Sequence, residues 1–390
     1  MQHPQQVERD AFEIAIICAL SVESNAVEAA FDRFFKRDEL LFDTRRQGDP
    51  NSYTFGIIGQ HNVLLVYMPG MGKASSASVS ASLRGSFPNI RLGLVVGICG
   101  AVPELGNKKI FLGDIIISTG VAQVDFGQRY TGHFVRKDTL DDNLGRPNTE
   151  LRGFLRRLSG WKEQQEFNPK FLGNIRDICG KKGFSDWTKP TLEIDTLYSA
   201  DYGHRHRNLR NCSVCAQVGE ERPVFCESAL SMSCEQLGCN NVSRKREAED
   251  VPVCHFGHIA SSDQVMKSAL DRDRIANQEK VLGFEMEGAG VWDNFPTVII
   301  KGACDYADSH KNKTWQRYAS VTAAAGAKAF LQQWEVSSRD FTRMAESQGF
   351  EYFAGNGSDQ RLTMFDNTSA KIGNQGYRQT ISGPITMNFS

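Results

Sequence analysis

The feature of this chain that most constrains its fold is the alternation, between residues 12 and 130, of short apolar runs with stretches of helical periodicity. Residues 12–20, FEIAIICAL, are apolar at odd and even positions alike, which predicts a strand buried on both faces, as in a parallel sheet. The stretch after it has apolar residues at the i, i+3, i+4, i+7 spacing of a helix, namely Val27, Ala30, Phe31 and Phe34. Strands that alternate with helices are typical of α/β folds.

The same signals recur along the rest of the chain. We predict further strands at residues 52–59, 61–68, 91–98, 113–119, 254–262 and 297–305, and a strand that leads into a helix at 281–295. We predict further helices at 74–85, near 151–160 and 169–179, and at 318–334. The sequence therefore predicts one α/β domain over residues 12–335, with a central twisted mixed β-sheet flanked by helices.

Charge and hydropathy limit the partners of the chain. Its 390 residues include 45 basic and 46 acidic side chains, a net charge of -1, which argues against a nucleic acid or a membrane as the main partner. The apolar run IAIICAL is too short for a signal sequence or a membrane span. We therefore expect a cytoplasmic protein that binds a small molecule.

Several carboxylates follow the apolar runs, where ligands bind in an open parallel sheet. These residues are Glu23, Glu285, Glu287 and Asp305. Burial at a sheet edge raises the pKa of an acid toward the range needed for proton donation. Departure of a purine from a nucleoside needs such an acid, together with a clamp for the ribose hydroxyls and a positioned nucleophile. Spacing alone also allows these acids to cap helices or to pair with basic residues.

Seven sequence blocks occur in an order and spacing that narrow this choice: IAIICALSVES, GMGKASSA, VVGICGAV, GDIIIS, GHIASSDQV, GFEMEGAGV and VIIKGACDYAD. They resemble the nucleoside phosphorylase/nucleosidase superfamily. The resemblance is strongest to methylthioadenosine/S-adenosylhomocysteine nucleosidases and to the related domains of fungal multidomain, immune-receptor-like proteins. It covers about residues 12 to 334, and it implies a nucleoside phosphorylase-like fold.

The resemblance also implies roles for the strand-end residues. Asp305 is the expected general acid for purine N7, and Glu287 is expected to hydrogen-bond the ribose hydroxyls while Met286 packs against the sugar. Glu285 belongs to the same strand end. Glu23 is expected to hold or activate the water, although an acid in the first turn of a helix is also favoured by the helix dipole.

Two aliphatic residues favour hydrolysis over phosphorolysis. Where hexameric purine phosphorylases carry Arg and Ser, this sequence has Val95 and Ile98, which cannot satisfy phosphate oxygens. Lys73 is able to bind an anion, but we expect it to be a solvated lysine at a helix start. The predicted activity is that of a purine-nucleoside N-ribosyl hydrolase, with no cofactor required. The alternatives are a phosphate-dependent phosphorylase that uses Lys73 and backbone amides, and a catalytically idle nucleoside-sensing or signalling module.

Other positions match the substrate site of the family or depart from it. Gly72, Gly97 and Gly100 are expected near the substrate, although the GMGK glycines also suit a tight turn. Val265 stands where the family has a purine-stacking Phe, and Phe126 or Tyr130 is an alternative source of an aromatic face.

Three further positions and the assembly complete what the resemblance implies. Cys304 and Lys301 replace a Ser and an Arg that are common in the bacterial nucleosidases, and Asp263 matches a motif position to which we assign a structural role. Active sites in the superfamily often use residues of a neighbouring subunit. We therefore expect a homodimer or a higher homo-oligomer.

Two segments depart from the α/β pattern. Residues 196–252 are polar and contain five of the ten cysteines. A C-x2-C pair with nearby histidines suits a structural zinc, with His204, Cys212 and Cys215 as the candidate ligands, but reduced thiols or an adventitious disulfide remain open. Residues 336–390 are rich in Gly, Asn, Gln, Ser and Thr, and we expect a flexible tail or an amyloid-type signalling motif.

Overall fold

The computed structural model describes residues 6–190, 195–208, 212–218, 225–240, 242–245 and 251–335. The chain divides into units of residues 1–340 and 341–390, and all of the described residues belong to the first. The expectations for residues 336–390 therefore lie outside the described residues.

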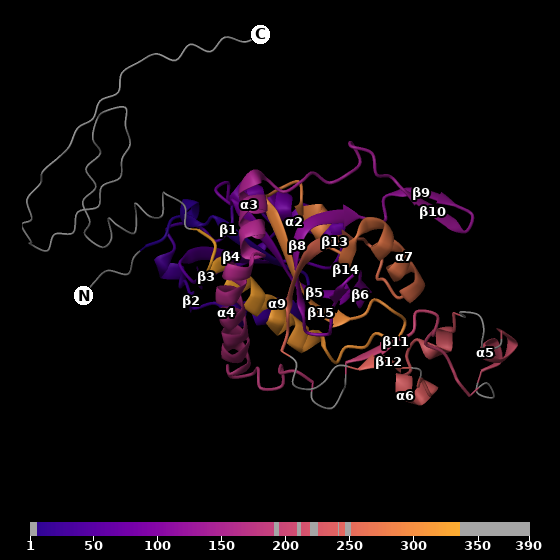
Figure 1. Ribbon diagram of the computed structural model, residues 1–390. Helices are drawn as coiled ribbons and strands as arrows, with labels where there is room; N and C mark the ends of the chain where they lie inside the picture. The colour runs from indigo at the N-terminus through magenta and orange to yellow at the C-terminus, as the bar shows by residue number, and fades with distance from the viewer. Residues whose placement is uncertain are drawn as a thin grey trace, which may run out of the picture. The chain divides into compact units, whose positions relative to one another are not determined.

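A nine-stranded sheet forms the centre of the domain (Figure 1). β1 pairs in parallel with β4 and β5, and β15 runs parallel to β5 but antiparallel to β8. The predicted mixed α/β fold is thus confirmed. The order across the sheet is β14 (Val281–Glu285), β13 (Cys254–Ser261), β8 (Ile115–Gln123), β15 (Thr297–Asp305), β5 (Leu92–Ala101), β1 (Ile14–Cys18), β4 (His61–Tyr67), β3 (Ser52–Ile58) and β2 (Arg33–Phe34).

At one end of this sheet the strands form a closed arrangement, because the edge strand β14 also pairs with β5. β14 pairs with β13 and also, in antiparallel register, with the end of β5, so that Gly283 lies opposite Ala101 and Phe284 opposite Gly100. A Cβ at Gly283 would lie 3.2 Å from the Gly100 carbonyl oxygen and 2.9 Å from Ile116 Cδ1, so glycine permits the close approach. The closure brings the end of β14 beside the end of β5.

Helices cover both faces of β15. Gly302 faces α9 (Gln316–Leu331), because a Cβ there would lie 2.0 Å from the Ala319 carbonyl oxygen. Ile299 faces the opposite way, toward Gly288 at the start of α8 (Gly288–Val291). α1 (Ser21–Ala30) and α4 (Trp161–Cys179) pack against α9, and α2 (Lys73–Ser86) packs against α8.

Two predicted helices have different limits in the structure. The first ends at Ala30 instead of continuing through Phe34, because the chain turns into β2 and Arg33 pairs with Ile57 of β3. α4 begins at Trp161, eight residues before the predicted start, and continues through Pro169. Phe167 and Phe171 on either side of this proline are 0% and 1% exposed, so core packing offsets the backbone hydrogen bond that proline cannot donate.

The Cys-rich segment is predicted as an insertion, and the elements among its described residues are short. β11 (Thr196–Tyr198) pairs with β12 (Val242–Lys245), and between them lie α5 (Ser213–Val218), η4 (Glu227–Ala229) and α6 (Cys234–Leu237). The elements outside this segment that remain to be named are η1 (Arg9–Ala11), η2 (Arg37–Glu39), β6 (Glu104–Leu105), β7 (Lys108–Lys109), β9 (Gly127–Tyr130), β10 (His133–Arg136), α3 (Thr149–Leu158) and α7 (Ala269–Glu279).

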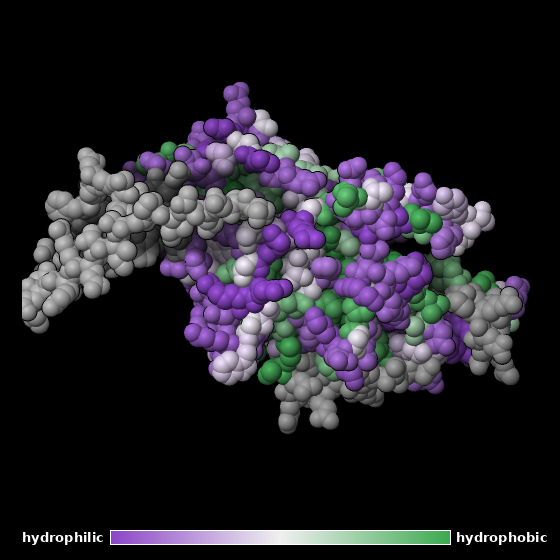
Figure 2. Space-filling view, turned by 45° about the horizontal axis from the view of Figure 1, so that its top comes forward, coloured by the Kyte–Doolittle hydropathy of each residue, from purple (hydrophilic) through white to green (hydrophobic). Residues whose placement is uncertain are grey.

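The core and the surface separate as expected for an α/β domain. The five residues of β1 are at most 2% exposed, and Ile299, Ile300 and Val298 of β15 are fully buried. Hydrophilic residues predominate on the face in Figure 2, and hydrophobic residues form smaller patches between them. Across the residues with assigned structure, no helix combines the length and the apolar character that crossing a membrane requires.

Replacement of glycine by alanine should have opposite effects on stability at two positions, because one glycine packs closely against α9 and the other does not. Gly302→Ala should lower the free energy of unfolding by about 1–3 kcal/mol, because the new methyl group meets the α9 backbone. Gly173→Ala, in the interior of α4 with no atom within 4 Å of the added Cβ, should raise it by about 0.5–1 kcal/mol. Urea denaturation curves of both variants measure this, and equal shifts would contradict the described packing.

Candidate active site

Lys301 of β15 lies at the centre of the predicted acidic cluster. Its Nζ is 2.9 Å from Glu287 Oε2 and 4.0 Å from both Glu23 Oε1 and Glu285 Oε2. All four residues are at most 5% exposed. Burial alone would lower the pKa of Lys301, but the three carboxylates outweigh it and raise this pKa. One ammonium group therefore interacts with three buried acids.

The backbone explains how Glu23 reaches this lysine. Lys301 pairs in register with Gly97 of β5, and a Cβ at Gly97 would lie 1.9 Å from Glu23 Oε1. The same oxygen accepts a hydrogen bond from Ile98 N at 2.8 Å. The missing side chain of Gly97 thus leaves the space that the carboxylate of Glu23 fills.

Glu23 also has the structural role that the sequence left open. Its Oε2 accepts hydrogen bonds from Ala19 N at 3.0 Å and Leu20 N at 2.9 Å, at the start of α1. Burial raises the pKa of Glu23 despite these bonds and despite the nearby Lys301. A carboxylate accepts about four hydrogen bonds. Glu23 accepts three, from Ala19, Leu20 and Ile98, which leaves room for one more donor.

The two glutamates after β14 differ in what they bind. The carboxylate of Glu285 accepts hydrogen bonds from the backbone N–H groups of Glu287 and Gly288 at 2.9–3.0 Å, and it therefore caps α8. Burial raises the pKa of Glu285. The carboxylate of Glu287 instead accepts a hydrogen bond from Lys301, and Met286 between the two is half-buried. Glu287 is the better placed of the two to contact a ligand.

Asp305 faces a different environment from Lys301, although both belong to β15. The pairing of β15 with β5 shifts register between Ala303 and Asp305, and such irregularities change the direction of a side chain. Asp305 Oδ1 accepts a hydrogen bond from Ala307 N at 2.9 Å, and Oδ2 lies 3.1 Å from Lys311 Nζ. Gly100 leaves room for it, because a Cβ there would lie 2.9 Å from Oδ1.

Lys311 and the central position of Lys301 were not foreseen from the sequence. Lys301 was noted only as a replacement for an arginine, although a lysine in the middle of an apolar strand is itself a signal of a buried ion pair. Lys311 stands in a polar loop, where the sequence does not distinguish it from a solvated lysine.

A pocket of about 670 Å³ opens beside Asp305, a volume typical of small-molecule sites. Asp305, Lys311 and His310 line it together with Tyr198 and Tyr202 of the insertion. The rings of Tyr198 and His310 stack at 4.0 Å, and that of Tyr202 stacks on Tyr198 at 5.9 Å. Glu23, Glu285 and Glu287 are not among the lining residues, so of the four predicted acids Asp305 alone lines this pocket.

The GMGK turn differs from its expectation. Lys73 is not solvated: its Nζ pairs with Asp125 and lies 3.7 Å from Asp263 Oδ2. Asp263 Oδ1 accepts a hydrogen bond from Lys73 N at 2.8 Å, which gives this aspartate a structural contact. Gly72 has φ +107°, a conformation that favours glycine, and precedes the first residue of α2.

The residues that the sequence suggested for contact with the base do not line this pocket. Val265 and Phe126 are 48% and 43% exposed, and neither lines the pocket. The Phe126 ring instead lies 5.3 Å from Lys137 Nζ, and Tyr130 lies in the exposed strand β9. Val95 is 1% exposed in β5. Tyr198 and Tyr202, which the sequence did not single out, are among the aromatic residues that line the pocket, together with Phe225, Tyr306 and Trp315.

The candidate zinc ligands are grouped differently from the prediction. Cys212 and Cys215 lie with Cys226 and with His206, and not with His204. His204 lies with Cys234 and Cys239 in a second group. The predicted set of His204, Cys212 and Cys215 is therefore wrong as a single site, because neighbouring histidines belong to different groups.

Similarity to solved structures agrees with this fold. The 5′-methylthioadenosine/S-adenosylhomocysteine nucleosidase of Helicobacter pylori matches with a TM-score of 0.50 and 14% identity, over 83% of this chain and 99% of that one. The futalosine hydrolase of the same organism gives the same values. The chain thus has the α/β fold of these nucleoside-cleaving enzymes.

Sequence similarity agrees with this fold. Residues 13–164 match the model of the phosphorylase superfamily. A nucleotide-binding leucine-rich repeat (NLR)-like protein of Hyaloscypha variabilis is 32% identical over 328 residues, which are 83% of this chain. This chain spans 29% of the length of that relative.

The buried charge cluster predicts a pH-dependent effect of removing its cation. Lys301→Met should lower the free energy of unfolding at pH 7 by about 3–5 kcal/mol, because it leaves buried carboxylates without a partner. The loss should be smaller at pH 5. The raised pKa values of Glu23 and Glu285 mean that the folded state takes up protons there, so stability falls as the pH rises.

Urea denaturation at pH 5 and pH 7 measures this loss, and two control variants are compared with Lys301→Met. Lys301→Arg keeps the cation and should retain most of the stability, whereas Lys313→Met removes an exposed charge and should change it by less than about 0.5 kcal/mol. A loss for Lys301→Met that is the same at pH 5 and pH 7 would show that buried carboxylates are not its cause.

Proposed function

We propose that this chain is a purine-nucleoside N-ribosyl hydrolase. The observation that carries the proposal is the position of Asp305, which lines the pocket at the end of β15, while Glu287 and Glu23 follow β14 and β1, two strands that pair with β5 beside β15. The names of the similar solved structures, a nucleosidase and a futalosine hydrolase, support cleavage of an N-glycosidic bond.

In the proposed reaction Asp305 donates a proton to N7 of the purine. The electron pair of the C1′–N9 bond leaves with the base, and the sugar becomes an oxocarbenium ion. Glu287 accepts hydrogen bonds from the ribose hydroxyls, and Lys301 balances its charge. Glu23 takes one proton from the water whose oxygen bonds to C1′. The products are the free purine and ribose, and no cofactor takes part.

The charges near the site support water as the nucleophile instead of phosphate. A phosphate dianion needs cations and donors that are free to bind it. Lys73 pairs with Asp125, Lys301 faces three carboxylates, and Lys311 lies against Asp305. Val95 and Ile98 add aliphatic side chains where phosphorylases carry polar ones. Phosphate would have to displace a carboxylate from one of these lysines.

The reaction is tested by incubating the purified full chain with adenosine, inosine, guanosine and methylthioadenosine, each with and without phosphate. Chromatography then follows the base and the sugar. Release of a purine and of the free sugar without phosphate is the expected outcome. Strict dependence on phosphate, with ribose 1-phosphate as product, would establish a phosphorylase. Binding of a nucleoside with no release of base would establish a sensor.

Asp305→Asn should lower the rate of base release by about 10²–10⁴-fold, because the amide keeps the shape of the side chain but does not donate the acidic proton. Asp293→Asn makes the same change at an exposed position and should leave the rate unchanged. Initial rates under saturating nucleoside compare the two variants. An active Asp305→Asn enzyme would refute the assignment of this residue as the acid.

A further inference from the structure

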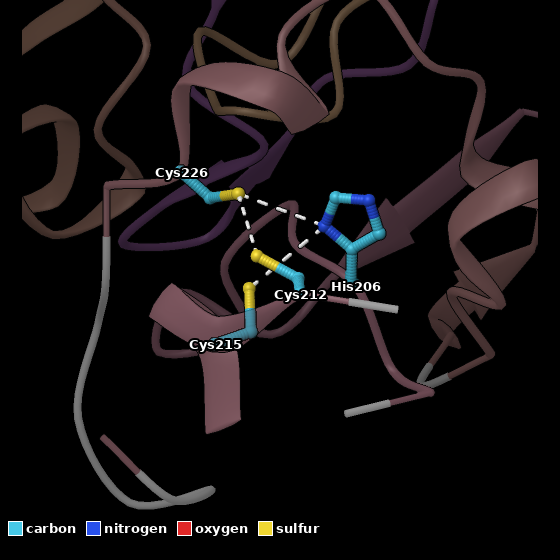
Figure 3. Close-up of side chains that lie close together, drawn as sticks. All are labelled: His206, Cys212, Cys215 and Cys226. Carbon is cyan, nitrogen blue, oxygen red and sulfur yellow. Dashed lines mark hydrogen bonds between the residues drawn. The ribbon is translucent and has the colours of Figure 1, made fainter. Parts of the chain in front are cut away.

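The Cys-rich insertion contains two clusters of metal-ligating side chains that the proposed reaction does not use. One consists of His206, Cys212, Cys215 and Cys226, whose side chains point toward one another in Figure 3. The other contains His204, Cys234 and Cys239. Within each cluster the candidate ligand atoms all lie within 4.8 Å of one another.

The distances in the first cluster fit a tetrahedral zinc ion. Zinc bonds of about 2.3 Å to sulfur and about 2.0 Å to nitrogen place two thiolates about 3.8 Å apart, and a thiolate about 3.6 Å from an imidazole nitrogen. The Sγ atoms of Cys212 and Cys226 are 3.7 Å apart. His206 Nδ1 is 3.6 Å from Cys226 Sγ and 3.9 Å from Cys215 Sγ. A disulfide would require about 2.0 Å between sulfurs.

The insertion also has too small a core to account for its own order. Its described hydrophobic cluster consists of Ala229 and Leu237 together with two of the cysteines, Cys215 and Cys226. Its helices α5 and α6 have six and four residues, far below the length at which a helix is stable alone. Segments with so little apolar burial are commonly held by a structural metal.

The second cluster shows the same spacing. His204 Nδ1 lies 3.6 Å from Cys234 Sγ and 3.9 Å from Cys239 Sγ. The other ring nitrogen, Nε2, is 2.9 Å from the Met232 carbonyl oxygen, to which it donates in the tautomer that leaves Nδ1 free. A hydrogen bond to the distal nitrogen is the usual way in which a protein orients a metal-binding histidine.

His310 lies beside the second cluster but belongs to a loop outside the insertion. It lies in the loop after β15, is 7% exposed, and its ring centroid is 5.3 Å from that of His204. Its Nε2 is buried without a hydrogen-bond partner among the parts of the chain that the structure describes. Its side chain also contacts the Cys239 thiol. A buried ring nitrogen without a partner fits the fourth ligand of a metal site.

We propose that the insertion binds two zinc ions, one at His206, Cys212, Cys215 and Cys226, and one at His204, Cys234, Cys239 and His310. The second ion joins the insertion to the loop that follows Asp305. Ser309 Oγ in this loop accepts a hydrogen bond from His204 N at 3.0 Å, and the His310 ring stacks on Tyr198 in the pocket wall. The second zinc is therefore a positioning element of the pocket, and it does not contact the reacting atoms.

Metal analysis of the purified full chain tests the proposal. After expression with zinc and dialysis, mass spectrometry of the metal should give two zinc ions per chain. Cys212→Ser and Cys239→Ser should each retain one, whereas Cys179→Ser, in a cysteine outside both clusters, should retain two. A wild-type content of one ion or none, or a full content in either cluster variant, would overturn the two-site proposal.

A cobalt spectrum keeps the test decisive if the serine variants do not fold. Wild-type protein loaded with Co²⁺ in place of zinc should show thiolate-to-cobalt charge-transfer absorption and the visible bands of tetrahedral Co²⁺. Their absence would overturn the proposal. Neither readout depends on base release, so failure of the zinc sites and failure of the proposed hydrolase activity are distinguishable.

The role of His310 has its own test in the rate at which a chelator removes zinc. His310→Gln should speed the release of one ion at least about tenfold and leave the other unchanged, because only one site loses a ligand. His133→Gln, in the exposed strand β10, should change neither rate. Unchanged release of both ions from the His310 variant would remove this residue from the second site.

Discussion

The ammonium group of Lys301 joins the end of β14 and the middle of β15 to the start of α1, which is far from both in the sequence. Buried carboxylates are costly without a cation, so the geometry of this sheet edge depends on that contact. Two features of the backbone make this contact possible. Gly97 leaves space for Glu23, and the pairing of β14 with β5 brings in Glu285 and Glu287.

The side chains of β15 face two different environments, because the pairing of this strand with β5 is irregular near its end. Lys301 points toward the acids, and Asp305, four residues later, points toward Lys311 and the pocket. The register shift between Ala303 and Asp305 separates these directions. The lysine of the buried acidic cluster and an acid that lines the pocket thus belong to the same strand.

The sequence predicts the sheet well because its strands are continuous apolar runs, which is the signal of burial on both faces. It predicts helix limits less well. The predicted helix at 169–179 begins too late, because α4 continues through Pro169, where Phe167 and Phe171 are buried on either side. The candidate site residues at strand ends could also be predicted from the sequence, since topology alone brings the ends of β1, β5 and β15 to one edge.

What the sequence could not give is which charges pair. Lys73 was expected in solvent, but it pairs with Asp125, which is 52 residues away and is brought near only by the folded sheet. The same holds for the pocket wall, since Tyr198 and Tyr202 belong to an insertion outside the family pattern. His204 and His206 are two residues apart and belong to different clusters, a division that depends on the local turn of the chain.

The order of the clustered residues along the chain also bears on how the insertion assembles. The ligands from 206 to 226 lie inside the span from 204 to 239, so the two groups are nested instead of crossed. Gathering the inner group shortens the loop that the outer group must close, and a shorter loop loses less chain entropy on closure. In the proposed arrangement the outer group also takes His310, which follows β15 in the chain. Closing the outer group therefore requires both the inner group and the folded sheet, and the pocket wall depends on both.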